Sequence, residues 1–185
     1  MAADAPAPFG PRLRLATPAD ADAIARVHVA AWQDTYTGIL PASFLARLSI
    51  HEDASRWQRL VADRQSGLFV HVAAGADGII GFAVGGPNRR GHRRYTGELQ
   101  AIYLRRASQR QGIGSALARA VAAGLAERRL SSMIVWVLAK NAGARQFYEA
   151  LGGRAAGRRQ LEIAGIRLEA VAYGWKDTSG LRADA

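Results

Sequence analysis

Residues 98–114, ELQAIYLRRASQRQGIG, decide the fold of this chain. The apolar start of this stretch predicts a strand, and the helical spacing of Leu and Val after it predicts a helix over residues 115–128. Between them lies a loop, residues 109–114, that contains Gly112 and Gly114. A glycine loop that leads into a helix presents backbone N–H groups without partners at the positive end of the helix dipole. The stretch therefore predicts an anion site, which a phosphate can approach closely because glycine has no Cβ.

Two familiar phosphate-binding motifs do not match this loop. The dinucleotide fingerprint G-x-G-x-x-G requires a third glycine where Leu117 stands, and a P-loop requires a Lys directly after its last glycine, where Ser115 stands. The loop resembles instead the [Q/R]-x-x-G-x-[G/A] motif of the GCN5-related N-acetyltransferases, the GNAT family. Gln109, Gly112 and Gly114 occupy the three defining positions.

A second stretch extends this resemblance. Residues 133–138 predict a strand, and the pattern N-x-x-A-x-x-F-Y-x-x-x-G follows from Asn141 to Gly152, at the family's usual distance from the loop. The resemblance is specific over roughly residues 96–153, because the loop stands between a strand and a helix as the motif requires.

The composition predicts one globular domain. The chain has 185 residues, of which 49% are apolar, and its mean hydropathy is -0.07. We expect a single domain over residues 11–176, with disordered tails at 1–10 and 177–185. No apolar run approaches the ~18–20 residues that a membrane helix needs. The first ten residues do not resemble a signal peptide, so we expect a cytoplasmic protein without a membrane partner.

The absence of cysteine excludes disulfides, thiolate metal ligands and a cysteine nucleophile, so any acyl transfer is expected to bypass a cysteine-bound intermediate. The four histidines are far apart in the sequence, and no metal site is expected. The net charge of +10 comes almost wholly from arginine. It indicates either an anionic partner or a solvated surface in which Arg replaces Lys. Because no basic helix carries interleaved aromatics, a nucleic-acid partner is not expected.

The order of elements predicts an α/β fold. Three helical pieces follow a first strand, and a β–α–β crossover in the middle requires the strands at 98–104 and 132–138 to run parallel. Residues 154–163 and 166–175 predict a closing hairpin around Ala164 and Gly165. This is an αβα sandwich with a mixed central sheet. The resemblance to GNAT proteins implies about seven strands and a splayed parallel pair.

The same resemblance implies acetyl-CoA as cosubstrate and no metal. In the family, the pantetheine arm lies between the splayed strands and the pyrophosphate binds the amides of the glycine loop. The cofactor-binding residues implied here are Ile102, Tyr103, Leu104, Gln109, Arg110, Gln111, Gly112, Ile113, Gly114, Ser115, Asn141 and Tyr148.

Direct transfer to an amine requires a base, an oxyanion donor and an acid for the leaving thiolate. Glu98 is the candidate base, because alternation along a strand is expected to place it on the same face as Gln100 and Ile102. The alternative for Glu98 is an exposed residue at the strand edge. The backbone N–H of Tyr103 or Ile102 would stabilise the oxyanion.

Tyr148 is the candidate acid. Core packing alone would explain an aromatic residue on that helix face, but a buried hydroxyl needs a partner, and the resemblance places it beside the CoA sulfur. Asn141 is expected to cap this helix or to bind the pantetheine. Trp32 and Tyr36, four residues apart on the first helix, either face the acceptor or are core aromatics.

We therefore expect an N-acetyltransferase that moves the acetyl group to a primary amine of a small molecule. Two alternatives remain open: a protein N-terminal or lysine acetyltransferase, and a non-catalytic module that binds acyl-CoA. The resemblance also implies a homodimer formed through the last strands.

Overall fold

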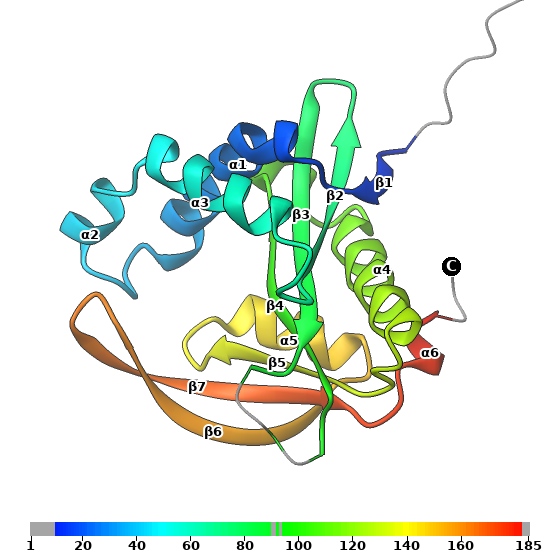
Figure 1. The fold of residues 1–185 in the computed structure, drawn as a ribbon. Coiled ribbons are helices and arrows are strands. Elements are labelled where there is room, and N and C mark those ends of the chain that lie inside the picture. The colour runs from blue at the N-terminus through cyan, green and yellow to red at the C-terminus, as the bar shows by residue number, and fades with distance from the viewer. Residues whose placement is uncertain (1–9, 90–91, 93, 183–185) are drawn as a thin grey trace, which may run out of the picture.

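A computed structural model describes residues 10–89, 92 and 94–182, and these fold around a seven-stranded sheet of order β1-β2-β3-β4-β5-β7-β6 (Figure 1). The strands are β1 (Arg12–Leu15), β2 (Phe69–Gly75), β3 (Gly78–Pro87), β4 (Gly97–Leu104), β5 (Met133–Leu138), β6 (Arg154–Ile163) and β7 (Ile166–Trp175). The helices are α1 (Ala21–Tyr36), α2 (Ala42–Ala46), α3 (Ile50–Ala62), α4 (Ile113–Glu127), α5 (Ala142–Ala150) and α6 (Ser179–Arg182). These elements confirm the predicted order of strands and helices, with α6 in addition.

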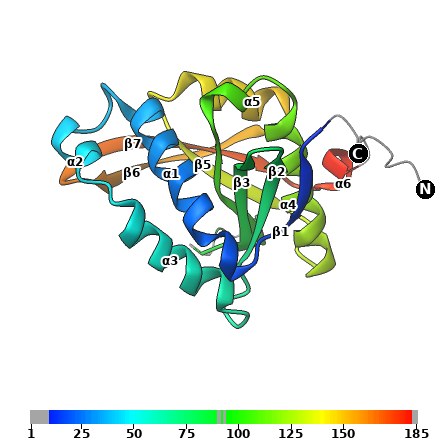
Figure 2. The same cartoon turned by 90° about the horizontal axis from the view of Figure 1, so that it is seen from above.

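Helices cover both faces of the sheet (Figure 2). On one face, α1 and α3 pack against alternate residues of β2 and β3, and Phe82 is completely buried there. On the other face, α4 and α5 pack against the remaining residues of these strands and against β5. The predicted αβα sandwich is therefore confirmed.

The parallel pair β4–β5 is paired over only two positions, Gly97 with Met133 and Glu98 with Ile134. All other neighbouring strands are antiparallel. Beyond those two positions β4 and β5 diverge, so that β2, β3 and β4 run in a different direction from β5, β7 and β6 (Figure 1). This is the predicted splayed pair, and it opens the sheet in the middle.

A bulge in β4 lies next to this opening. Ala101 and Leu99 stand opposite consecutive residues of β3, so Gln100 is an extra residue in β4. As a result Leu99 joins the α4 side of the core together with Ile102 and Leu104. Strict alternation would have placed Leu99 on the other face. An even-numbered residue before the bulge therefore lies on the opposite face of the sheet from an even-numbered residue after it, and the same holds for odd-numbered residues.

The C-terminal segment is folded where a disordered tail was expected from residue 177. The backbone N–H of Thr178 donates to the Ser131 carbonyl at 3.0 Å, and Leu181 from α6 packs into the core beside α4. Burial of Thr178 and Leu181 explains the order of this segment, because both positions exclude water. The expected N-terminal tail lies outside the described residues except for Gly10, as do residues 183–185.

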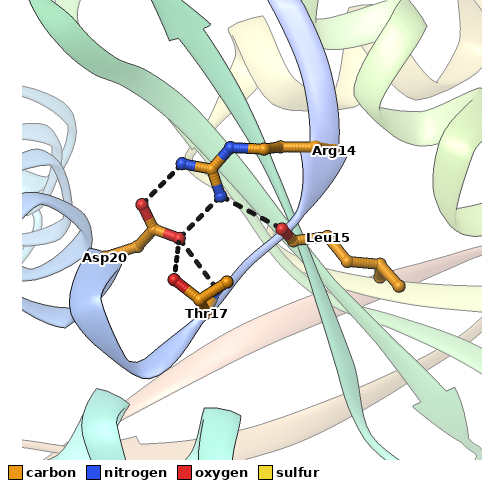
Figure 3. A network of polar contacts seen from close by, with 4 residues as sticks. All are labelled: Arg14, Leu15, Thr17 and Asp20. Carbon is orange, nitrogen blue, oxygen red and sulfur yellow. Dashed lines mark hydrogen bonds and ion pairs between the residues drawn. The ribbon is translucent and has the colours of Figure 1, made fainter.

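The turn between β1 and α1 is held by a charged network (Figure 3). Arg14 donates from both terminal nitrogens to the carboxylate of Asp20, each at 2.7 Å. The backbone N–H and the hydroxyl of Thr17 donate to the same carboxylate. The hydrogen bonds from Arg14 lower the pKa of Asp20 to about 2, against the opposing effect of its burial. The edge strand β1 is thereby fixed to the start of α1.

We expect Asp20→Asn to destabilise the fold at neutral pH and to remove part of its acid sensitivity. Because the folded-state pKa of Asp20 lies below its ordinary value, its contribution is present above about pH 4 and is lost as the pH falls toward 2. The contribution is about 1–2 kcal/mol after allowance for solvent at Arg14. Urea unfolding at pH 7 and near pH 2 measures it. The difference in free energy of unfolding between the variant and the unsubstituted protein should shrink at the lower pH. Substitution of Asp22, which is exposed, by Asn should not show this pH-dependent difference.

Candidate active site

A cleft of about 610 Å3 opens where β4 and β5 diverge. Its walls are β4 from Gln100 to Leu104 and β5 from Val135 to Val137. One end is closed by the loop before α4 and the start of α5, and the other end is lined by Thr35 and Tyr36 of α1. The volume lies in the range usual for small-molecule sites.

The glycine loop is shaped to present its amides. Arg110 and Gly112 both have left-handed backbone conformations, with φ of 62° and 79°. The first hydrogen bond of α4 runs from Ala116 N–H to the Gly112 carbonyl, so the preceding amides have no partner within the helix. Within the described residues, the amides of 110–115 donate to no backbone carbonyl. The loop therefore has the geometry that an anion site requires, and binding of an anion there stays a prediction.

Most residues predicted to bind the cofactor line this one cleft. They are Ile102, Tyr103, Leu104, Gln109, Arg110, Gly112, Gly114, Ser115, Asn141 and Tyr148. Gln111 and Ile113 do not line it with their side chains: Gln111 donates to the Ala107 carbonyl at 2.9 Å, and Ile113 is buried in the core. Only their backbone N–H groups are available to an anion. The side chain of Asn141 caps α5 by accepting the Ala144 N–H at 3.1 Å.

Three tyrosines meet in the cleft. The hydroxyls of Tyr36 and Tyr103 lie 3.4 Å apart, a long hydrogen bond that joins α1 to β4. Tyr148, on α5, is 5% exposed. Burial raises the pKa of all three phenols, and the neighbouring Tyr36 raises the pKa of Tyr148 further. The phenols therefore keep their protons at physiological pH and act as hydrogen-bond donors.

Trp32 lies behind this tyrosine cluster and does not line the cleft. Its ring packs against Tyr36 at 5.0 Å between centroids and against buried His28 at 5.3 Å. His28 in turn holds the carboxylate of Asp53 at 2.7 Å and packs against the ring of Tyr103. The structure thus brings Tyr36 to the predicted acceptor site and places Trp32 in the support behind it.

Glu98 is separated from the other predicted site residues. The expectation that Glu98 shares a face with Ile102 is wrong, because the bulge at Gln100 reverses the alternation between them. Glu98 is 1% exposed and does not line the cleft. Its carboxylate accepts from the Arg89 side chain at 2.7 Å and from the Arg89 N–H at 3.1 Å. The role of Glu98 as a base stays a prediction.

Gln100 is a cleft residue that the sequence reasoning missed. It lines the cleft at the bulge, and its Nε2 is buried without a hydrogen-bond partner. The one sequence signal for Gln100 is an amide side chain between apolar residues of the strand. Strict alternation along the strand does not reveal the bulge, so it does not identify Gln100 as a site residue.

Distant parts of the chain pack together beside the end of the cleft that Tyr36 lines, where the acceptor is predicted to bind. Leu40 and Leu45, from the segment after α1, form a buried cluster with Leu138, Leu168 and Ala170 of β5 and β7. Partly buried residues from α1, α2 and the β6–β7 hairpin pack around this cluster. Tyr36 and Trp136 pack against this cluster and also line the cleft, so the cluster forms a packed wall beside the cleft at this end.

Metal and membrane features are both missing from the described residues. No three His, Asp or Glu side chains among residues 10–89, 92 and 94–182 are grouped so as to hold a metal ion. In the same ranges, every helix is too short or too polar to cross a bilayer.

Comparison with known proteins identifies this architecture. The sequence signature of the Acetyltransferase (GNAT) family matches residues 29–153. The chain belongs to this family. It is an N-acetyltransferase that depends on acetyl-CoA, as the glycine loop and the splayed strands indicated.

Relatives of this acetyltransferase share both sequence and fold. It is 40% identical over 160 residues to an uncharacterised N-acetyltransferase, YuaI, of Bacillus subtilis, with 86% of this chain and 89% of the relative covered. Its fold matches PaiA N-acetyltransferase of Thermoplasma acidophilum in complex with coenzyme A, with a TM-score of 0.68, 18% identity, and 90% and 100% of the two chains covered. It also matches yncA, a putative acetyltransferase of Salmonella typhimurium with acetyl-CoA, with a TM-score of 0.67, 18% identity, and 89% and 92% coverage.

We expect Gly112→Ala in this acetyltransferase to weaken binding of CoA about tenfold. A Cβ at φ 79° strains the loop by about 1 kcal/mol and stands where the amides face an anion. Isothermal titration calorimetry with CoA measures the effect. Gly165→Ala is the matched control, because Gly165 has φ 76° and equally open surroundings, but lies in the β6–β7 turn. Equal losses in both variants would contradict a specific role for the loop.

Proposed function

We propose that this acetyltransferase acetylates the primary amine of a small molecule. The observation that carries the proposal is the packed wall at the acceptor end, where Leu40 and Leu45 meet the β5–β7 strands. A protein chain would need an open groove that continues past this point. A small amine fits beside Tyr36 and Tyr103 without displacing any of these contacts.

The residues of the cleft fit acetyl-CoA, which supplies the acetyl group as a thioester. The amides of residues 110–115 are free to bind its pyrophosphate, and Gly112 leaves the approach open. Backbone groups of Ile102, Tyr103 and Leu104 on the side facing β5 lack a strand partner, since β4 and β5 are paired only at residues 97–98 and 133–134. These groups would hold the pantetheine arm.

Tyr148 is the proposed general acid. Its hydroxyl lines the cleft, and burial keeps the proton on Oη because the pKa of the phenol is raised. It can donate this proton to the thiolate as the C–S bond breaks, and a proton from water restores the phenol. Since the chain contains no cysteine, no cysteine-bound intermediate forms, and we infer that the acetyl group passes directly to the amine. None of the residues found to line the cleft is an Asp or Glu, so we infer that the amine loses its proton to water.

We expect Tyr148→Phe to lower kcat by about 100-fold while the Kd for CoA changes little, because general acid catalysis contributes at least that factor. The ring remains to fill its place in the core, so the fold should be retained. Steady-state thiol release and calorimetry measure the two quantities. Tyr95→Phe removes a buried phenol that does not line the cleft and should leave kcat unchanged. A Tyr148→Phe enzyme with full turnover would refute the acid role.

An acetyl-CoA-dependent thiol-release screen tests the acceptor class. We expect turnover with small primary amines and none with peptides whose only amine is an N-terminus or a lysine. Turnover confined to the peptides would favour a protein acetyltransferase. CoA binding without turnover on any acceptor would favour a non-catalytic module.

A further inference from the structure

The acceptor end of the cleft offers hydrogen-bond donors that the proposed chemistry does not use. Gln100 stands at the bulge, between the two paired positions of β4 and the part of β4 that faces the open cleft. Its Nε2 is buried and has no partner, although the residue lines the cleft. A buried amide N–H without a partner costs about 1–3 kcal/mol, and an acceptor oxygen placed in the cleft would recover that cost.

The Tyr36–Tyr103 pair adds a second donor in the same cleft. Each hydroxyl has one hydrogen to donate, and within a pair 3.4 Å apart only one of the two hydrogens is used. The other hydrogen remains available to a ligand in the cleft, which both residues line. The raised pKa of each phenol keeps these hydrogens in place at neutral pH.

Among the described residues that line the cleft, none is an Asp or Glu that would attract a second positive charge. Arg110 is the charged residue found to line the cleft, and it belongs to the glycine loop at the opposite end. Glu98, the nearest carboxylate along β4, is enclosed by Arg89. A diamine would therefore leave its second ammonium without a counter-charge, whereas a carbonyl or carboxylate oxygen could accept from the unpaired N–H of Gln100.

We propose that Gln100, together with the Tyr36–Tyr103 pair, binds an oxygen of the acceptor, so that the preferred acceptor is a primary amine that also carries a carboxylate or carbonyl group. This rests on the proposed action on small amines and narrows it to one chemical class. Gln100 determines specificity here, and the tyrosine pair supplies the second donor. The acceptor amine itself is left free to react, since both donors bind oxygen.

An amine panel in matched sets tests the proposal. Each set contains an amine with a carboxylate, its primary amide, an apolar amine and a diamine of similar length, as in β-alanine, β-alaninamide, n-butylamine and 1,4-diaminobutane. We expect kcat/KM for the oxygen-bearing amines to exceed that of the apolar amine by roughly tenfold, with the diamine lowest. The difference should lie mainly in KM, because the bond to Gln100 exists before the reaction.

Two variants at position 100 make the test specific. Gln100→Leu should lower kcat/KM for the oxygen-bearing amines to the value for the apolar amine, and should leave kcat/KM for the apolar amine unchanged. Gln100→Glu replaces the donor by an acceptor and should shift the preference toward the diamine. Calorimetry with CoA checks that both variants are folded. Gln58→Glu makes the same chemical change on an exposed part of α3 and should leave the order of the amines by kcat/KM unchanged.

Three results would overturn the proposal. If Gln100→Leu leaves the order of amines unchanged, Gln100 takes no part in recognising the acceptor. If it lowers kcat for every amine by one factor with unchanged KM, Gln100 acts on the thioester carbonyl and not on the acceptor. If peptides alone are acetylated, the action on small amines falls together with this inference, whereas the first two results leave that action intact.

Discussion

The structure depends on one constraint: a backbone N–H or C=O that is removed from water needs a partner. Strands β4 and β5 provide such backbone partners for each other at only two positions, and beyond these the two strands diverge. The backbone groups beyond that point, like the first amides of α4, have no partner from the described protein on that side. A ligand with its own donors, acceptors and negative charge supplies what is missing. Acetyl-CoA, the cosubstrate of the GNAT family, has this combination.

Local sequence signals predict much of this fold because they act over a few residues. The side chain of Ser49 accepts the Glu52 N–H at the start of α3. The glycine loop leads from β4 into α4, which begins directly after Gly112. The hairpin of β6 and β7 has the bounds that the sequence predicts, since Ala164 and Gly165 take the left-handed conformations of a tight turn. The shape of the glycine loop follows from the same kind of local rule, because Gly112 takes the left-handed N-cap position of α4 and Gly114 lies in its first turn.

The sequence does not predict what depends on register between distant strands. The bulge at Gln100 arises from the pairing of β4 with β3, and no residue within β4 announces it. It moves Glu98 away from the face assumed for a base and leaves Gln100 at the cleft. The order of α6 has a similar origin, because Leu181 finds its apolar partners on α4, far away in sequence. Trp32 and Tyr36 share a helix face, yet only packing decides which of them reaches the cleft.

The wall at the acceptor end also has a consequence for biosynthesis. Leu40 and Leu45 leave the ribosome early, but their partners Leu168 and Ala170 belong to the penultimate element of the chain. Until β7 emerges, β5 has an open edge and these leucines lack the part of their buried cluster that β7 contributes. Nascent chains can therefore assemble the glycine loop and its helix well before the acceptor end exists. The packed wall beside the cleft is completed last, and a chain released short of β7 would lack it.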